Sequence, residues 1–510
     1  MSNKASDNLH RLIKSLSKAE KRYFKVFSSR HVIGDKNNYQ ILFDAIDKQD
    51  DYDEAALLKK FKSKSLIHRF SISKNRLYAA ILKSLDSFHS NSSAEAQLHR
   101  QLHWVEILYR KSLYDQGLKQ LHSAKKLAEK HEKFAILVEI AKWEKLLIER
   151  DNYESLDADG IQDLLRQDEE LRDQMSAYNE LWNIKSHIFL MLYTQGKVRS
   201  QEELTRYIKL MDGMVGEIKG TKASSENLYM VNHIYSAYHF GLGEYQESYP
   251  YLLKNLKLIE SKPHLFDEEP NIYLSVLTNA IYVGMRLNKW DESQKYLDKL
   301  RKLPQKLQGQ VSEDLEIRMF TIIKSTELTL YTQSGLFEEG LKIIPEIEEG
   351  LYKYEDHISS VRKAHFFFNI AVIYFGLEKY HEALKWINQL LNNVEIDKSR
   401  DIHCMAQILN MVIHLELGNK SLLPFALRST QRFLETRKKV YRFETIMLQF
   451  INEMLKKREK PGIELYQDLV EKLTELKSDS FERRVYEYFD FLAWASTKIN
   501  MTIFRDEIGK

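Results

Sequence analysis

Few residues in this chain have the types and spacing that chemistry requires. His99 and His103 lie four positions apart, which would place two imidazoles on one helical face at metal-ligand spacing. No third ligand accompanies them, and the single cysteine, Cys404, excludes a zinc site built from several thiolates. The chain also has no glycine-rich phosphate loop and no His-Glu-x-x-His motif. We therefore predict a protein that is not an enzyme and that carries no cofactor and no metal.

Basic residues at the N-terminal end have the composition of a nucleic-acid-binding surface. Residues 1–90 contain 18 lysines and arginines against 10 acidic residues, so their net charge is +8, and the remaining 58 and 63 give −5. Within this basic head (residues 1–90), the run SISKNRLYAAIL predicts a helix after a polar stretch, as in a helix-turn-helix or winged-helix domain. Residues at the start of that helix would then contact bases or phosphates, and the preceding basic residues would contact phosphates: Lys74, Asn75 and Arg76, with Lys59, Lys60, Lys62, Lys64 and Arg69.

The alternative for the head is structural. Its sequence predicts four short helices, with Ser17 and Glu20 forming a capping box and Ser71 or Ser73 capping the last helix. Four apolar residues of that last helix would dock the head on the repeats that follow, leaving the basic side chains in solvent: Leu77, Ile81, Leu82 and Leu85. A small basic helical domain is expected in both cases.

The composition favours helices throughout the chain. Only 7 prolines and 18 glycines punctuate 510 residues, whereas a sheet protein needs many turns. The longest apolar run, residues 366–377, is too short to span a bilayer and is interrupted by Asn369. The first twenty residues lack the apolar core of a signal peptide, and one cysteine fits a reducing compartment. A cytoplasmic protein of bacterial type, with no membrane contact, is expected.

A recurring motif organises the chain after the head. In YHEA, an aromatic residue, Tyr380, precedes a small residue, Ala383, by three positions, between two stretches of helical periodicity. Related motifs recur at spacings of 39 to 47 residues, around Tyr114, Tyr153, Tyr245, Trp290 and Phe337, with degenerate copies at Val198 and Lys420. Each period therefore predicts one helical hairpin, and about eight hairpins follow one another.

The small residue of each motif has a physical reason. Two helices joined by a short turn approach most closely near that turn, where a large side chain would separate them. The predicted contact positions are Gly117, Ser155, Ser248, Ser293, Gly340 and Ala383. The preceding aromatic ring would fill the space beside the contact and bury apolar area.

On these residues the chain resembles the tetratricopeptide-repeat family. Ala371 and Ala383 match the family's two small positions, and Tyr374 and Tyr380 match its aromatic positions. The period exceeds the family's 34 residues, so the helices or connections are longer. The resemblance implies an all-α fold: a right-handed superhelical array of antiparallel helix pairs over residues 95–460, after the basic head at 1–90 and before a C-terminal helical cap at 461–510.

The same resemblance implies a binding groove lined by the first helix of each pair. Asn279 and Asn369 fall where the family often keeps an asparagine that bonds to the ligand backbone. Neighbouring groove positions would be Thr278, Tyr282, Arg286, His233, Gln333 and His365, with Phe240, Ser325, Thr329, Phe368 and Phe375 beside them. The alternative interpretation of Phe368 and Phe375 is that they pack between adjacent hairpins.

Two functions follow as expectations. The first is a non-catalytic scaffold that binds another protein or a peptide in the solenoid groove. The second is a transcriptional regulator, whose basic head contacts DNA while the solenoid senses a peptide or protein partner. Salt-dependent DNA binding by the head would distinguish them.

Overall fold

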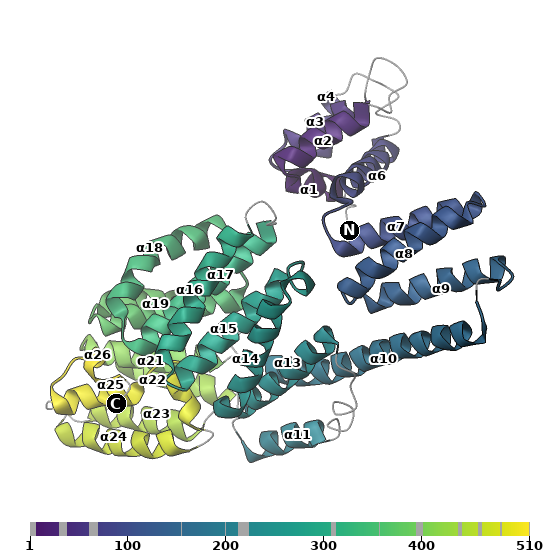
Figure 1. Ribbon diagram of the computed structural model, residues 1–510. Helices are drawn as coiled ribbons and strands as arrows, with labels where there is room; N and C mark the ends of the chain where they lie inside the picture. The colour runs from purple at the N-terminus through teal and green to yellow at the C-terminus, as the bar shows by residue number, and fades with distance from the viewer. Residues whose placement is uncertain are drawn as a thin grey trace. The chain divides into compact units, whose positions relative to one another are not determined.

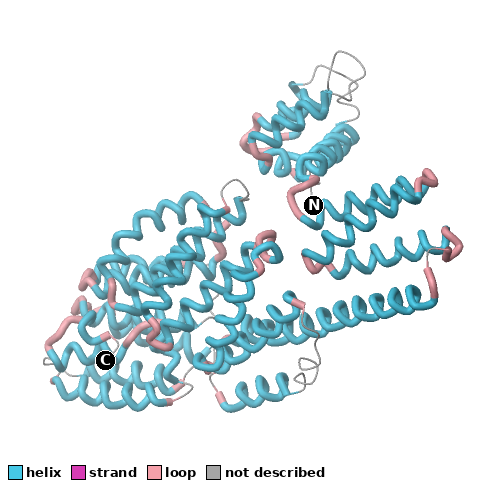
Figure 2. Tube along the Cα trace, in the orientation of Figure 1, coloured by secondary structure: helices cyan, strands magenta, loops and turns pink. Residues whose placement is uncertain are grey.

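The computed structural model contains only helices in the part of the chain that it describes (Figures 1 and 2). The described residues are 7–29, 38–60, 70–154, 156–198, 200–212, 224–307, 313–355, 357–393, 401–436, 441–456, 462–479 and 482–508. They form 24 α-helices and two 3-10 helices, without a strand. The prediction of an all-α protein is confirmed.

Two compact units divide the chain. The N-terminal unit comprises residues 1–175 and the C-terminal unit residues 176–510, and the division falls inside α10 (Ala158–Gln195). None of the described helices is both long enough and apolar enough to span a membrane. Each unit is considered by itself below.

The described residues of the head form five helices, one more than expected: α1 (Asn8–Ser15), α2 (Lys18–Ser29), α3 (Asn38–Asp47), α4 (Glu54–Lys60) and α6 (Phe70–His89). The capping box at α2 is present, because Ser17 N donates to Glu20 Oε2 at 2.7 Å and Glu20 N donates to Ser17 Oγ at 3.3 Å. The prediction that Ser71 or Ser73 caps α6 is wrong, because the helix already begins at Phe70.

The apolar residues of α6 complete the head's own core. Leu77 and Ile81 are fully buried with Phe24 and Phe43 from α2 and α3, and Leu85 packs against the same cluster. Leu82, by contrast, is 45 % exposed. The prediction that Leu77 and Ile81 dock the head on the following repeats is therefore wrong, because both side chains are buried in the core of the head itself.

The rest of the N-terminal unit holds α7 (Ala94–Arg110), α8 (Tyr114–Lys130) and α9 (Phe134–Arg150), each packed on the next. The following α10 is one helix of 38 residues. It replaces two predicted helices, the second of the hairpin at Tyr153 and the first of the hairpin at Val198. After Gly160 its sequence contains neither glycine nor proline, so nothing interrupts it.

The C-terminal unit continues with α11 (Gln201–Asp212) and then with helices packed in adjacent pairs. These pairs are α13 (Ser225–Leu242) with α14 (Tyr245–Ser261), α15 (Pro270–Arg286) with α16 (Trp290–Lys306), α17 (Glu313–Ser334) with α18 (Phe337–Lys353), α19 (Ser360–Gly376) with α20 (Tyr380–Asn392), α21 (Asp401–Glu416) with α22 (Leu423–Thr436), and α23 (Arg442–Lys456) with α24 (Ile463–Ser478). The first helices also contact one another in succession from α15 to α23. This pairing is consistent with a helical-repeat solenoid.

The turns inside these pairs repeat one hydrogen-bonded geometry. After α19, Glu378 adopts a φ of +59°, Glu378 N donates to Phe375 O, and Lys379 N donates to Tyr374 O, which together make a Schellman motif. The same pair of bonds recurs around Ser112, Gly243, Asn288 and Gly418, each with positive φ. The sequence motif therefore marks a repeated helix stop.

Four of the predicted small residues lie at close contacts between helices, whereas an added Cβ at Gly117 would lie 3.8 Å from its nearest neighbour, an ordinary van der Waals distance. Ser248, Ser293 and Ala383 are fully buried. Ser248 Oγ donates to Ser236 O of the preceding helix at 2.8 Å, as expected for contact within a pair. Gly340 differs, because a Cβ there would lie 2.2 Å from Ile373 Cδ1 of α19, in the next pair. Ser155 lies outside the described residues.

The C-terminal segment is not one continuous helix. After α24 come the 3-10 helix η2 (Glu482–Glu487), α25 (Phe491–Asn500) and α26 (Phe504–Glu507). Asp490 caps α25, since its Oδ1 accepts from Ala493 N at 2.9 Å. Residues 481–499 have the apolar spacing of one amphipathic helix, at Tyr486, Phe489, Leu492 and Ala493, but the helical structure breaks there and leaves Tyr488 to Asp490 outside any helix.

Candidate functional site

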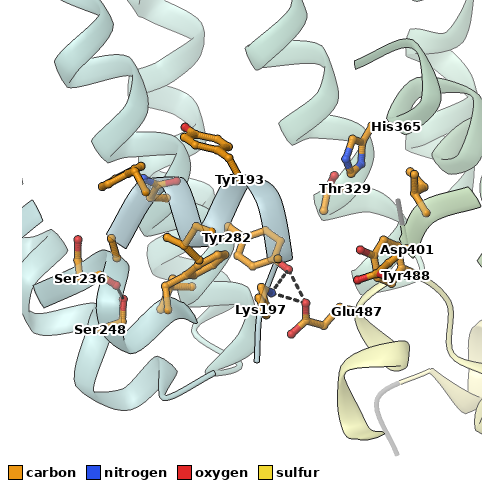
Figure 3. A pocket seen from close by; sticks show the side chains of 18 of the residues that line it. Tyr193, Lys197, Ser236, Ser248, Tyr282, Thr329, His365, Asp401, Glu487 and Tyr488 are labelled. Carbon is orange, nitrogen blue, oxygen red and sulfur yellow. Dashed lines mark hydrogen bonds and ion pairs between the residues drawn. The ribbon is translucent and has the colours of Figure 1, made fainter. Parts of the chain in front are cut away.

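One cavity in the C-terminal unit gathers most of the predicted groove residues. It has a volume of about 470 Å³ and is lined by the end of α10, by α13, α14, α15, α17, α19 and α21, and by the segment around η2. Figure 3 shows Lys197, Tyr282 and Glu487 on one side of this central cavity and Thr329, His365 and Asp401 on the other. First helices of successive pairs thus supply most of its wall.

Glu487, at the end of η2, lines the cavity and bonds to side chains from several parts of the unit. Lys197 forms an ion pair with its carboxylate, which also accepts from Tyr245 Oη and from Tyr282 Oη, the latter at 2.9 Å. Lys197 Nζ in turn donates to Tyr245 Oη at 2.9 Å and to Tyr282 Oη at 3.0 Å. Residues 290 positions apart in sequence are joined by this cluster.

The same residue is also gripped through its backbone. Arg286 Nη2 and Gln333 Nε2 each donate to Glu487 O at 3.0 Å, and Arg286 Nη1 donates to Gln333 Oε1 at 2.9 Å. Side chains of α15 and α17 therefore hold the carbonyl of an irregular segment, as a groove holds a bound peptide.

Burial and charge oppose each other at this ion pair. Burial alone would raise the pKa of Glu487, but Lys197 and Arg286 outweigh burial and lower that pKa to about 2. Burial alone would lower the pKa of Lys197, yet Glu487 holds it well above its ordinary value. Both groups are therefore charged at neutral pH and compensate each other.

Three of the predicted partner-binding residues are thus engaged by the chain itself. Tyr282, Arg286 and Gln333 all contact Glu487. Thr278 lies on the same helix, where its hydroxyl donates to Leu274 O at 2.8 Å, and it does not line the central cavity.

The two predicted asparagines occupy different environments in the cavity wall. Asn279 is exposed there. Asn369 is buried, its Nδ2 donates to His365 O at 2.8 Å, and its Oδ1 accepts from Thr332 Oγ1 at 3.2 Å. Both residues line the cavity. Asn279 is exposed and can bind a ligand directly, whereas Asn369 would first have to break its two hydrogen bonds.

His233 is the unusual polar group of the wall. Its ring stacks on Phe189 and Tyr229 with centroids 4.9 and 5.5 Å apart, and its buried Nδ1 has no hydrogen-bond partner. Burial, with a contribution from Lys185, lowers the pKa of His233 to about 4. The side chain of His233 therefore lines the cavity as a neutral imidazole at neutral pH, and its Nδ1 lies inside the protein.

The predicted groove aromatics divide in two. Phe368 and Phe375 are almost fully buried and pack edge-on against Tyr488 and Phe489 of the segment after η2, and Phe368 also lines the cavity. Their packing between adjacent hairpins stays a prediction. Phe240 lines the cavity beneath Lys197 Nζ, which lies 4.5 Å from the ring centroid. The other predicted neighbours, Ser325 and Thr329, lie on α17, and Thr329 lines the cavity.

Sequence reasoning missed Lys197 and Glu487. Lys197 follows α10 at a position without a helical pattern, so no signal singles it out. Glu487 precedes Asp490, whose capping role was the available sign that the helix is broken there.

The predicted nucleic-acid residues do not share one environment. Lys74 bonds to Glu54 and to Tyr52 Oη and lies over the Tyr52 and Phe70 rings, so its charge is used inside the head. Asn75 and Arg76 are exposed, as is Lys59. The side chain of Lys60 is outside the described part of the chain, together with residues Lys62, Lys64 and Arg69.

The two histidines at metal-ligand spacing face glutamates. His99 Nε2 lies 3.9 Å from Glu95, and His103 Nδ1 lies 3.3 Å from Glu106. Among the described residues, no group of three or more histidine, cysteine, aspartate or glutamate side chains is placed to hold a metal ion.

Comparison with known proteins returned no match: no protein-family model fits the chain, and no curated protein is significantly similar to it in sequence.

Proposed function

We propose that the C-terminal unit is a tetratricopeptide-like solenoid of antiparallel helix pairs that binds a short polypeptide in its central cavity, without catalysis. The observation that carries this proposal is the exposed amide of Asn279, which lines the cavity of about 470 Å³ together with several aromatic side chains. An amide side chain can donate to a peptide C=O group and accept from a peptide N–H group, so an exposed amide in a concave wall suits a bound polypeptide.

The cavity chemistry suits a peptide. Aromatic rings of Phe189, Tyr193 and Phe240 offer apolar contact, and amide, hydroxyl and imidazole groups offer hydrogen bonds to peptide N–H and C=O groups. The charges of Lys197 and Glu487 cancel, so no strong net field selects a highly charged small molecule.

A random-peptide selection on the full-length protein tests the proposal. Peptides recovered from it should lose about tenfold in affinity for Asn279→Ala, a loss typical of one hydrogen bond. The matched control is Asn388→Ala, which removes an exposed amide from α20 away from the cavity. Equal affinity for the two variants, or no peptide recovered, would reject the proposal.

DNA binding by the basic head is the second candidate, and the exposure of Asn75 and Arg76 on α6 favours it. On this proposal the protein is a transcriptional regulator whose solenoid senses the peptide. Affinity for duplex DNA should then fall steeply with salt, and Arg76→Ala should reduce the salt slope by about one. Arg110→Ala, an exposed arginine of α7, is the control, and a salt-independent result would exclude this function.

A further inference from the structure

The environment of Glu487 is that of a bound ligand more than that of an ordinary surface ion pair. Its carboxylate lines the central cavity and meets three donors that come from separate parts of the unit: Lys197 after α10, Tyr245 at the start of α14, and Tyr282 in α15. Lys197 is held over the rings of Phe240, Tyr245 and Tyr282, with Nζ 4.5 to 5.3 Å from their centroids. A carboxylate site with a fixed cation is thus preassembled by the helices.

The segment that supplies Glu487 is short and is held by side chains. It is a six-residue 3-10 helix, a conformation with weak internal hydrogen bonding, and its last carbonyl is gripped by Arg286 and Gln333. Beyond it, Phe489 and Phe491 are buried in the core and anchor the chain. Release of the Glu487 side chain therefore needs rotation at one residue, while the C-terminal helices stay packed.

We propose that Glu487 is an internal occupant of the acidic subsite of the peptide groove. A partner peptide with a glutamate flanked by aromatic residues, as in the chain's own Val485-Tyr486-Glu487-Tyr488, displaces it and bonds to Lys197, Tyr245 and Tyr282. This inference rests on the proposed peptide-binding function and specifies the chemistry of the peptide.

Two considerations favour displacement of Glu487 by a peptide carboxylate over a purely structural role for the Lys197–Glu487 ion pair. A buried ion pair stabilises little compared with apolar residues of the same size, and such pairs are best attested as specificity or switching devices. An intramolecular carboxylate also has a high effective concentration, so only a peptide with further contacts in the cavity can replace it. The wall around His233 and Asn279 offers those contacts.

The unit contains a matched comparison outside the cavity. Glu260 accepts from Lys299 Nζ at 2.6 Å and from Tyr273 Oη at 2.8 Å, so it has the same lysine and tyrosine donors on the surface. It does not line the central cavity. Glu260→Ala therefore removes an equivalent carboxylate without opening the subsite.

The first experiment asks whether the emptied subsite takes a carboxylate from solution. Thermal unfolding of full-length Glu487→Ala is measured with propionate and with propionamide, at constant ionic strength. Propionate should raise the melting temperature by about 2 °C or more beyond propionamide, because it binds only the folded state. Glu260→Ala and the unchanged protein should show no such difference, and an equal response of all three would overturn the inference.

The second experiment asks whether the occupant is a peptide. Acetylated and amidated VYEYFD, carrying a fluorophore, should bind Glu487→Ala about tenfold more tightly than the unchanged protein, and VYQYFD should lose that gain. If Glu487→Ala does not fold, Glu487→Gln replaces it, with a smaller gain expected. Propionate stabilisation without peptide binding would overturn the assignment of a peptide partner.

Failure here is distinguishable from failure of the proposed function. Peptides from the random selection that still depend on Asn279, together with no preference for VYEYFD over VYQYFD, would reject the acidic subsite and leave peptide binding intact. Absence of every peptide from the selection would reject both.

Discussion

Replacing His233 by phenylalanine should make the protein more stable at pH 7. Phenylalanine retains the ring between Phe189 and Tyr229 and removes Nδ1, which is buried without a partner. An unsatisfied buried polar atom costs about 1–3 kcal/mol, so a gain of about 1 kcal/mol at pH 7 is expected after allowing for imperfect fit of the new ring.

The pH dependence of the unfolding free energy gives a second, independent measure of what His233 contributes to stability. The pKa of His233 is about 4 in the folded protein against an ordinary 6.5, so the unfolded chain takes up the proton first as pH falls. Stability is therefore full above pH 6.5 and is lost between pH 6.5 and 4, by about 3 kcal/mol at 1.36 kcal/mol per pH unit. His233→Phe should not lose this contribution.

Urea unfolding followed by circular dichroism from pH 4.5 to 8 measures both effects. The difference between the unchanged protein and His233→Phe isolates this histidine from the other titrating groups. His187→Phe, at an exposed position of α10, is the control and should retain the full pH dependence. Parallel curves for His233→Phe and the unchanged protein, or a loss of stability at pH 7, would refute the reasoning.

Three further outcomes are expected. Because the pKa of Glu487 is about 2 in the folded protein against an ordinary 4.5, its contribution to stability is present above pH 4.5 and is lost as pH falls toward 2. Glu487→Gln should therefore reduce the pH dependence of the unfolding free energy in that window. An unchanged pH dependence would contradict this. Gly340→Ala should destabilise the protein by about 1–3 kcal/mol in urea unfolding, because its Cβ would lie 2.2 Å from Ile373 Cδ1. Gly117→Ala, whose Cβ would lie 3.8 Å from its nearest neighbour, should be neutral or stabilising. Equal effects of the two substitutions would count against the close contact at Gly340. Glu378→Gly should stabilise by about 0.5–1 kcal/mol in thermal unfolding by relieving a φ of +59°, and Gly418→Ala, at +68°, should destabilise by about 1 kcal/mol; a loss for Glu378→Gly would argue against strain at the turns.

The helices and their turns were predictable because local chemistry determines them. The recurring aromatic and small residues lie beside the repeated Schellman turns, and Ser248, Ser293 and Ala383 are buried as expected. The long α10 was mispredicted because the spacing of 39 to 47 residues was extended across a stretch with no helix breaker after Gly160. Periodicity suggested a turn there, and the absence of glycine and proline was the better guide.

Only the residues that the repeat helices contribute to the candidate site were predictable from the sequence. Helical spacing and the family resemblance brought Tyr282, Arg286 and Gln333 to one surface, and the structure places all three against Glu487. Their partner lies in an irregular segment about 150 to 200 residues further along the chain, where no period relates it to the repeats. Long-range pairing of this kind depends on the tertiary path of the chain, which local patterns do not encode.

The bond between Lys197 and Glu487 also bears on how the C-terminal unit unfolds. A linear array in which each hairpin touches only its neighbours frays from its ends, and its stability is a sum of local terms. Here Lys197, near the beginning of the unit, forms an ion pair with Glu487, near its end, so the terminal helices cannot unfold independently. Hydrogen exchange should therefore find one cooperative block where an open array would show a gradient of protection.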